Sequence, residues 1–488
     1  MSLQTLARTV LNSPIRRPLF DAANHVLMQQ RLRRPLFSLI DLWLSRSARP
    51  RRRASGFTPR IQLERSLVAR AILHTVERLM TSGQISPRVM RVISERWAKA
   101  WCLTTRTGAS CQRFRAEHGC DPPWFLTLSP GSACNLSCPG CYANGGSTAA
   151  NLPWPVLERV MAEARELWGV PLFVFSGGEP LLYRSCGHGV LDAAEQHPDC
   201  LFLMFTNGTM ITREVARRME RIANLTPAIS VEGMEESTDR RRGRGQFART
   251  LEAISLLRES GVPFGFSATL TRMNLTEILS DRFLDFFFLE LGAFYGFLFQ
   301  YMPIGRGACL DWMPTPGQRV DSWEAVWHAI ESKGIFLFDF WNHGPMVGGC
   351  MSAGRQGGHL YIDWAGRVMP CVFAPYSAAN IQEVYASGGT LEDVWKAPFF
   401  RAIRDWQREY GYDGGPLPKE QGNWMRPCPV RDHYAHFHRL VEEHLPEPED
   451  ENARLSLRDE AYAQGMAAYG EELQQLTDTM WNKIYVNP

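Results

Sequence analysis

The hydrophobic residues of this chain alternate between short apolar runs and stretches with a helical period. Six apolar runs are typical of buried strands: residues 124–129, 171–175, 201–205, 227–231, 262–268 and 295–303. Between the first two runs, apolar residues recur at helical spacing: Leu157, Val160, Met161, Ala164 and Trp168. Gly169 then follows as a helix stop. Strands that alternate with helices in this way predict a parallel sheet whose two faces are both covered.

Helices are also predicted before and after this alternating region. Residues 62–101 have the pattern of two helices, and Arg454–Trp481 has that of a final one. The apolar stretch Phe283–Tyr301 is interrupted by Asp285 and Glu290, and it falls where a helix and a strand of the alternating pattern belong. We therefore interpret it as core and not as a membrane span.

The composition is that of a globular protein, with 45% hydrophobic and 11% aromatic residues. A chain of 488 residues is longer than one hydrophobic core supports, so two or three domains are expected. Twelve cysteines without a signal peptide predict a reducing, cytoplasmic location, where thiols stay free to bind metal.

The net charge is only +2, but the charges are unevenly distributed. Residues 1–53 are rich in arginine, and the apolar residues of 36–44 lie beside these arginines, whereas Glu442–Glu460 is acidic. An arginine-rich amphipathic helix is typical of proteins that lie on anionic lipid. We therefore predict peripheral membrane contact through residues 1–53.

Three other interpretations of this arm remain open. It could be a solvated basic leader, it could dock on the acidic tail of the same chain, or it could receive a peptide or protein substrate. No recognised nucleic-acid-binding fold accompanies the arginines, so no nucleic acid partner is expected.

Three cysteines, Cys134, Cys138 and Cys141, lie close together after the first predicted strand. Three thiolates on one loop can hold three irons of a [4Fe–4S] cluster, which normally has four cysteine ligands. The fourth iron would then be open to an external ligand. The alternative is a zinc site or three unrelated thiols, but structural zinc has four closed ligands, and the offsets of the nearest candidates, His118 and Cys120, match no zinc pattern.

The C-x3-C-x2-C motif, followed by an aromatic residue, Tyr142, resembles the signature of the radical S-adenosylmethionine (SAM) superfamily. Gly177, Gly178 and Glu179 follow the second predicted strand and resemble the segment that meets the amino group of SAM in that family. Adjacent glycines allow the backbone to approach a ligand closely. The resemblance implies a [4Fe–4S] cluster, SAM as cofactor, and an α/β fold: a partial (β/α)6 TIM-like barrel with an N-terminal helical extension and a small C-terminal auxiliary-cluster domain.

Further segments match the family less specifically. Asn207 follows the third predicted strand and Ser230 ends the fourth, resembling positions where relatives contact the ribose and carboxylate of SAM. Asp239, Arg242 and Gly243 resemble a D-x2-R-G segment of peptide-modifying relatives. The alternative for each is an ordinary turn after a strand. All these segments follow strands, so they belong to the edge of a parallel barrel at which active sites lie.

A second cysteine set lies beyond the predicted barrel. Cys350 and Cys371 flank a predicted hairpin at residues 360–370, and Cys428 follows. This pattern resembles the auxiliary-cluster module called SPASM, and more closely its shortened form, twitch, which implies an auxiliary [4Fe–4S] cluster. Only three ligands are evident, so the cluster is either open to substrate or completed by a distant residue such as Cys309.

Three cysteines ahead of the barrel are evenly spaced: Cys102, Cys111 and Cys120. Gaps of eight residues suit no familiar ligand loop, so we favour a structure without metal there. The expected organisation has four parts: an arginine-rich helical region (1–120), the radical SAM barrel (121–340), the auxiliary-cluster domain (341–435) and an acidic helical tail (436–488).

The resemblance implies an oxidoreductase that cleaves SAM reductively to a 5'-deoxyadenosyl radical. This radical would abstract hydrogen from an unactivated carbon of a peptide, lipid or small-molecule substrate, with the auxiliary cluster assisting oxidation or bond formation. An electron donor such as flavodoxin or ferredoxin would be the partner. The alternative is a non-catalytic iron–sulfur electron-transfer or scaffold protein, but such a protein needs no SAM-facing turn like Gly177–Glu179.

Overall fold

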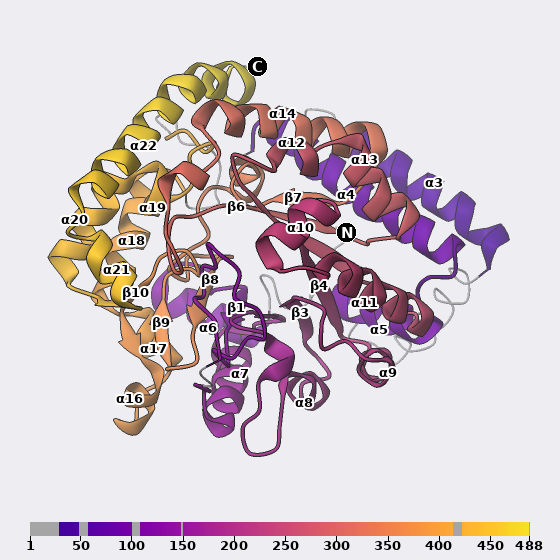
Figure 1. Ribbon diagram of the computed structural model, residues 1–488, viewed down its shortest axis with the longest axis horizontal. Coiled ribbons are helices and arrows are strands. Elements are labelled where there is room, and N and C mark those ends of the chain that lie inside the picture. Colours follow the sequence, from indigo (N-terminus) through magenta and orange to yellow (C-terminus); the bar gives the residue numbers. More distant parts are fainter. Residues whose placement is uncertain (1–28, 48–56, 100–107, 148–149, 413–421, 488) are drawn as a thin grey trace.

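A ten-stranded sheet forms the centre of the computed structural model, which describes residues 29–47, 57–99, 108–147, 150–412 and 422–487 (Figure 1). Its strand order is β11-β9-β8-β1-β2-β3-β4-β5-β6-β7. The first seven strands are parallel neighbours in chain order: β1 (Phe125–Leu128), β2 (Leu172–Phe175), β3 (Leu201–Thr206), β4 (Leu225–Val231), β5 (Gly265–Leu270), β6 (Gly296–Gln300) and β7 (Leu337–Asp339). All six predicted strands are confirmed, and β7 is an additional one.

The connections between these strands contain helices, as the alternating pattern predicts. They are α7 (Trp154–Trp168), α8 (Val190–Gln196), α9 (Arg213–Ile222), α10 (Glu235–Arg242), α11 (Gln246–Ser260), α12 (Leu275–Ile278), α13 (Asp281–Asp285) and α14 (Pro316–Lys333). Shorter turns lie at η2 (Pro180–Leu182), η3 (Phe286–Glu290), η4 (Leu310–Trp312) and α15 (Gly344–Val347). Gly169 ends α7 in the left-handed conformation, with φ of 68°; its N–H donates to Arg165 O, and the N–H of Val170 donates to Ala164 O.

The predicted hairpin continues the barrel sheet. β8 (His359–Ile362) pairs in parallel with β1 over four residues, and β9 (Arg367–Met369) returns antiparallel to β8. β11 (Ala379–Asn380) then pairs with β9. The sheet therefore runs without a break from the barrel strands into the segment that carries the second cysteine set, and the domain boundary near residue 340 stays a prediction.

The N-terminal extension is helical, as expected. It contains α3 (Gln30–Ser47), α4 (Pro59–Thr81), α5 (Pro87–Lys99) and α6 (Ala109–His118). α3 packs against α4 through buried Phe37 and an ion pair of 2.7 Å between Arg70 Nε and Asp41 Oδ1. Residues 1–28 and 48–53 of the arginine-rich arm lie outside the described residues.

The C-terminal part packs around the hairpin and along α14. It comprises β10 (Tyr376–Ser377), α16 (Ile381–Ala386), α17 (Leu391–Trp395), α18 (Pro398–Glu409), α19 (Pro429–Asp432), α20 (Tyr434–His444), β12 (Glu447–Pro448), α21 (Glu451–Ser456), α22 (Glu460–Trp481) and η5 (Asn482–Val486). The predicted final helix is divided in two, because Asp459 caps a new helix by accepting from the N–H of Tyr462.

The acidic segment and α3 lie at opposite edges of the molecule in Figure 1. β12 pairs antiparallel with β10, and Arg367 donates to the carbonyl of Glu449. The described part of the arm, α3, therefore does not dock on this acidic segment.

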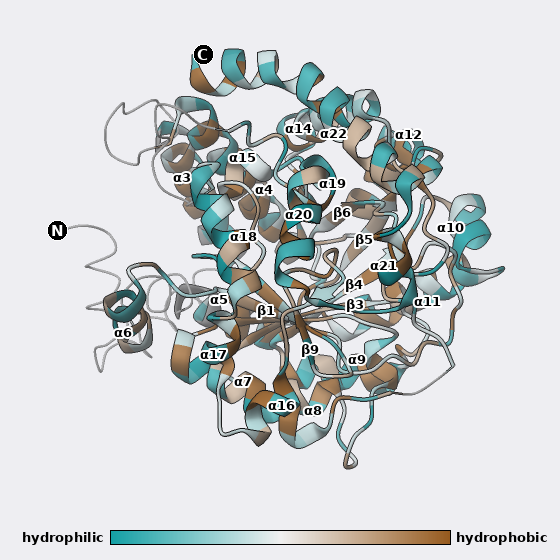
Figure 2. Cartoon of the chain, turned by 90° about the vertical axis from the view of Figure 1, so that its left-hand side faces the viewer, coloured by the Kyte–Doolittle hydropathy of each residue, from teal (hydrophilic) through white to brown (hydrophobic). Residues whose placement is uncertain are grey.

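One continuous hydrophobic core joins the barrel to the helices around it, and it extends from Ile61 on α4 to Tyr485 on η5. Hydrophobic colour concentrates on the central strands, while the outer sides of the helices are more hydrophilic (Figure 2). Among the helices that the structure describes, none combines the length and the apolar character needed to cross a membrane. The stretch 283–301 forms α13, η3 and β6, and so belongs to the barrel as predicted.

Candidate functional site

The first cysteine set lies on the loop that follows β1, at the carboxyl edge of the parallel strands. Cys134, Cys138 and Cys141 are all partly buried, and burial raises the pKa of the Cys134 and Cys138 thiols. Three thiols on one loop are an arrangement that could hold three irons of a cluster.

The glycine pair lies directly against this loop. The N–H of Gly178 donates to Gly131 O at 3.1 Å, and the N–H of Glu179 donates to Ala133 O at 2.7 Å. A Cβ at Gly178 would overlap the carbonyl of Ala133, and one at Gly177, where φ is +112°, would lie 2.8 Å from Ser129 Cβ. Neither position has room for a side chain, which is the physical reason for two glycines here.

The Glu179 carboxylate is buried and joins the ends of β2 and β3. Its Oε1 accepts from Thr206 Oγ1 at 2.7 Å and from the N–H of Leu181 at 3.2 Å, while Oε2 accepts from the N–H of Asn207 at 2.8 Å. Burial raises the pKa of Glu179, and these donors oppose the shift. Glu179 thus fixes the position of Asn207 relative to the glycine pair.

Asn207 meets the cysteine loop, but Ser230 is held differently. The Asn207 amide donates to Asn135 Oδ1 at 2.9 Å and lies 3.9 Å from Cys134 Sγ. Ser230 Oγ is 3.3 Å from Ser267 Oγ on β5. The structure therefore brings Gly177–Glu179 and Asn207 together with the cysteines, while the contact found for Ser230 is with the neighbouring strand.

Two arginines that the sequence patterns did not single out hold the cysteine loop. Arg306 donates through its backbone N–H to Cys141 O at 2.9 Å and through Nη1 to Cys138 O at 3.3 Å. Arg241 donates to the carbonyls of Pro139 and Gly140, each at 3.2 Å. The flanking glycines, Gly305 and Gly307, both have positive φ, and this Gly-Arg-Gly sequence could have indicated a tight turn at Arg306.

The D-x2-R-G segment has a structural explanation. Asp239 accepts from the backbone N–H groups of Gly245 and Phe247 at 2.6 and 2.8 Å, which fixes the turn before α11. Arg242 forms an ion pair of 2.5 Å with the buried carboxylate of Glu232. The positive charge of Arg242 lowers the pKa of Cys138 in opposition to burial, so it favours a thiolate there.

The second cysteine set surrounds a cavity. Cys350, Cys371 and Cys428 line this cavity together with mostly apolar side chains. Burial raises the pKa of Cys371 strongly and that of Cys428 to about 11. Cys309 is not among the cavity's residues and instead precedes η4, where its N–H donates to the Tyr301 hydroxyl at 3.3 Å.

Cys428 is anchored by a buried charge network. Its N–H donates to Asp432 Oδ2 at 3.0 Å, and Asp432 Oδ1 is paired with Arg319 at 2.6 Å and Arg431 at 3.0 Å. The two guanidinium groups lower the pKa of Asp432 well below its usual value despite burial. Arg431 also donates to Gln300 on β6 at 2.9 Å, so the network ties the cysteine to the barrel.

An aromatic contact joins the two cysteine sets. Tyr142, next to Cys141, lies 5.7 Å from Phe373, ring centre to ring centre. Phe373 lines the auxiliary cavity and packs on Trp341 at 4.9 Å and on Phe299 of β6 at 6.0 Å. Both candidate sites thus share a wall of aromatic side chains.

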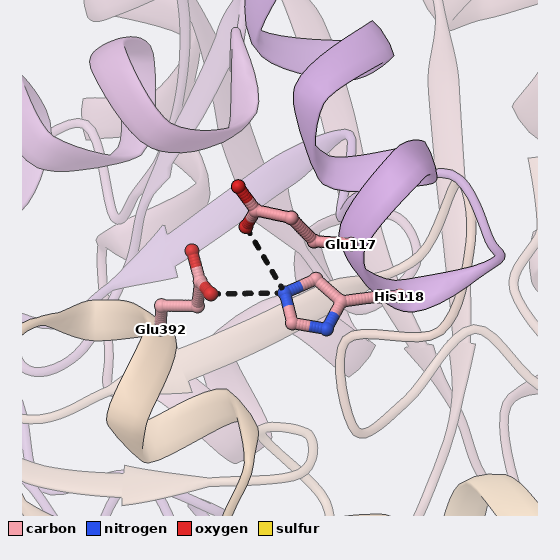
Figure 3. A group of neighbouring side chains, drawn as sticks. All are labelled: Glu117, His118 and Glu392. Carbon is pink, nitrogen blue, oxygen red and sulfur yellow. Dashed lines mark hydrogen bonds and ion pairs between the residues drawn. The ribbon is translucent and has the colours of Figure 1, made fainter.

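The absence of metal at the cysteines ahead of the barrel stays a prediction, because the structure describes only two of the three. Cys111 is buried on α6, Cys120 is partly buried after it, and Cys102 lies outside the described residues. His118 Nε2 is instead 2.9 Å from Glu392 on α17, with Glu117 at 3.9 Å (Figure 3). The His118 ring is therefore paired with carboxylates of α6 and α17.

Comparisons with known proteins agree with this geometry. Residues 128–282 match the family model described as the radical SAM superfamily, and residues 350–416 match SPASM, an iron–sulfur cluster-binding domain. An AdoMet-dependent heme synthase of Methanosarcina barkeri is 28% identical over 58% of this chain and 84% of its own length. The mycofactocin maturase MftC of Mycobacterium ulcerans is 29% identical over 62% and 82%, respectively.

A solved structure shows the same fold. SuiB of Streptococcus suis, bound to the precursor peptide SuiA, superposes with a TM-score of 0.50 at 16% identity, covering 68% of this chain and 77% of that one. The cofactors that follow from the two matched regions are a [4Fe–4S] cluster, SAM and an auxiliary iron–sulfur cluster. With its partial barrel, its glycine pair against a three-cysteine loop and its second cysteine set, the chain carries a radical SAM enzyme domain at residues 128–282 and a SPASM-type iron–sulfur module at residues 350–416.

Proposed function

We propose that this enzyme cleaves SAM reductively to a 5'-deoxyadenosyl radical, which abstracts hydrogen from an unactivated carbon of its substrate, and that the product is oxidised or newly bonded. The observation that carries the proposal is that Gly177–Glu179 and Asn207 meet the three-cysteine loop at the carboxyl edge of the barrel. An electron-transfer scaffold needs no such arrangement.

The protein's contribution is to hold the cluster, to orient SAM and to exclude water. Cys134, Cys138 and Cys141 would hold a cluster whose open iron supplies an electron for breaking a carbon–sulfur bond of SAM. The two glycines let their segment pack directly on the cysteine loop, and Asn207 presents its amide beside Cys134. Arg306 fixes the loop by its bonds to the backbone, so the cysteines keep their spacing.

For the substrate we propose a peptide. Its support comes from relatives whose names describe peptide modification, including the PqqA peptide cyclase of Gluconobacter oxydans, 27% identical over 59% of this chain. A porphyrin-type substrate is the second candidate, because the wall formed by Phe299, Phe340 and Phe373 suits a flat apolar ring and heme synthases are among the relatives.

The test of SAM cleavage uses the full chain, reconstituted with iron and sulfide without oxygen, then reduced with dithionite in the presence of SAM. We expect release of 5'-deoxyadenosine, which Cys138→Ala abolishes and Cys186→Ala, at an exposed cysteine outside both sites, leaves intact. Release that is equal in Cys138→Ala, or absent from the parent protein with its full iron content, would refute the proposal. The iron content of Cys371→Ala, compared with that of the parent protein, shows whether the parent holds one cluster or two.

We also propose that α3 contacts an anionic membrane surface. Leu39, Leu42 and Trp43 are 65%, 44% and 54% exposed, and their spacing puts them on one side of the helix. Arg34 and Arg46 are exposed on the same helix. Apolar side chains beside arginines fit a lipid surface with negative headgroups better than they fit water.

Vesicle flotation tests this contact. The protein should float with phosphatidylcholine vesicles that contain phosphatidylserine, and less with phosphatidylcholine alone. Leu39→Gln and Leu42→Gln should each weaken binding about fivefold, equivalent to ~1 kcal/mol of lost apolar burial. Leu455→Gln, at a leucine of similar exposure on the acidic α21, is the matched control. Equal flotation of all four proteins would remove α3 as the contact.

A further inference from the structure

The auxiliary cavity contains a buried histidine. His359, the first residue of β8, lines the same cavity as Cys350, Cys371 and Cys428. Its side chain is 2% exposed, and its Nε2 has no hydrogen-bond partner among the described residues. A buried polar atom left without a partner costs about 1–3 kcal/mol. Such an atom at the edge of a cavity lined by three cysteines indicates a missing partner in that cavity.

The imidazole ring is held in one orientation by two neighbours on β1. Its Nδ1 is 3.2 Å from Thr127 Oγ1, and its ring stacks on Phe125 at 4.6 Å between ring centres with an angle of 4°. When Nδ1–H donates to the Thr127 hydroxyl, Nε2 keeps a free lone pair. Metal-binding histidines are commonly fixed in this way, with the second ring nitrogen donating to a neighbouring oxygen.

The charge state of His359 and the position of its backbone also suit a metal ligand. Burial lowers the pKa of His359 to about 4, so the ring is neutral near pH 7, as metal binding requires. The backbone N–H of His359 donates to Met351 O at 2.9 Å, which places it beside the chain at Cys350.

A second buried histidine shows that burial alone does not create this arrangement. His343 is also buried with an unpartnered Nε2, and burial lowers its pKa to about 3. It does not line the cavity, and its Nδ1 accepts from the N–H of Asp339. Of the two, only His359 adjoins the cysteines.

We propose that His359, through Nε2, is the fourth protein ligand of the auxiliary iron–sulfur cluster. The assignment rests on the proposed function only in requiring a cluster at Cys350, Cys371 and Cys428. One neutral imidazole in place of a fourth thiolate makes the cluster less negative, and histidine ligation is known to raise the reduction potential of iron–sulfur centres. The auxiliary cluster is then closed by the protein and favours accepting an electron.

The test uses a full-length variant in which only the auxiliary site can hold a cluster: Cys134→Ala, Cys138→Ala and Cys141→Ala combined. After reconstitution without oxygen and reduction, pulsed electron paramagnetic resonance should detect a coupled nitrogen. Histidine-selective 15N labelling should change that coupling from 14N to 15N, and this readout needs no change at His359 itself. His359→Gln should remove the coupling, whereas His343→Gln, at the matched buried histidine, should keep it.

His359→Cys provides a further readout. A thiolate at this position should retain the iron, remove the nitrogen coupling and lower the reduction potential. A sample that holds iron but lacks a histidine coupling, or one whose coupling survives His359→Gln, overturns the assignment and leaves the auxiliary cluster standing. A sample that retains no iron overturns the auxiliary site itself, and the assignment with it.

Discussion

Gly178→Ala is the smallest change that tests whether the glycine pair builds the SAM site. The new methyl group would overlap the carbonyl oxygen of Ala133 and would lie 2.5 Å from that of Ser132. Both obstacles are backbone atoms of the cysteine loop, so no side chain can rotate away to make room. The loop and the glycine segment must therefore separate by roughly 1 Å to restore ordinary contact distances.

The free-energy cost follows from what this separation disturbs. Overpacking typically costs about 1–3 kcal/mol. The shift also weakens the bonds from Gly178 N–H to Gly131 O and from Glu179 N–H to Ala133 O, each worth about 1 kcal/mol net. A loss of ~3 kcal/mol in SAM binding corresponds to roughly a hundredfold weaker affinity.

The measurement is equilibrium binding of SAM to the reconstituted protein, with iron content and thermal unfolding recorded on the same samples. Gly317→Ala is the matched control, because Gly317 lies in the first turn of α14 and its nearest obstacle is Thr315 Oγ1 at 3.9 Å. This control should bind SAM normally and should unfold at the same or a higher temperature, since alanine favours a helix. Normal SAM affinity in Gly178→Ala would show that the close approach is not part of the binding site.

Three further predictions concern other parts of the structure. Burial raises the pKa of Glu64 from 4.5 to about 7, so between these pH values the folded state holds a proton that the unfolded state has lost. The free energy of unfolding should therefore fall by ~3 kcal/mol as the pH rises from 4.5 through 7. Urea unfolding at pH 5 and 8 should show this fall, and Glu64→Gln should remove it. Asp432→Asn leaves the two buried guanidinium groups of Arg319 and Arg431 without their counter-charge, so it should cost about 3–5 kcal/mol of stability and reduce auxiliary iron, measured by unfolding and iron content. Arg306→Met removes the side-chain bonds to the cysteine loop and should lower iron retention there, whereas Arg213→Met, at an exposed ion pair, should not.

The barrel strands were predictable because none of their residues is exposed and most of them are apolar. β7 escaped prediction because it has only three residues, too few for a pattern. The parallel pairing of β8 with β1 was also missed, since the paired residues, such as Leu126 and Leu360, lie far apart in the sequence. Pairing over such distances depends on the whole fold and leaves no local signal.

The candidate site shows the same division between local and distant signals. The cysteine spacing and the glycine pair are local, so the sequence carried them. Arg241 and Arg306 bind backbone carbonyls of the cysteine loop, and any loop offers such carbonyls, so no residue pattern identifies the contact in advance. The sequence patterns did not single out His359, because its unpartnered nitrogen is visible only once the cavity is known.

The sheet topology also constrains how the two candidate sites work together. The cysteine loop leaves the carboxyl end of β1, and the hairpin that carries Cys371 begins with β8, which pairs with β1 over its full length. Neighbouring strands cannot shift relative to each other without breaking their ladder of hydrogen bonds, so the spacing between the two sites is set by the sheet. The contact between Tyr142 and Phe373 follows from that fixed spacing. A substrate that meets both sites must therefore enter through the surrounding loops and not by opening one domain away from the other, because the hairpin that leads to Cys371 belongs to the barrel's own sheet.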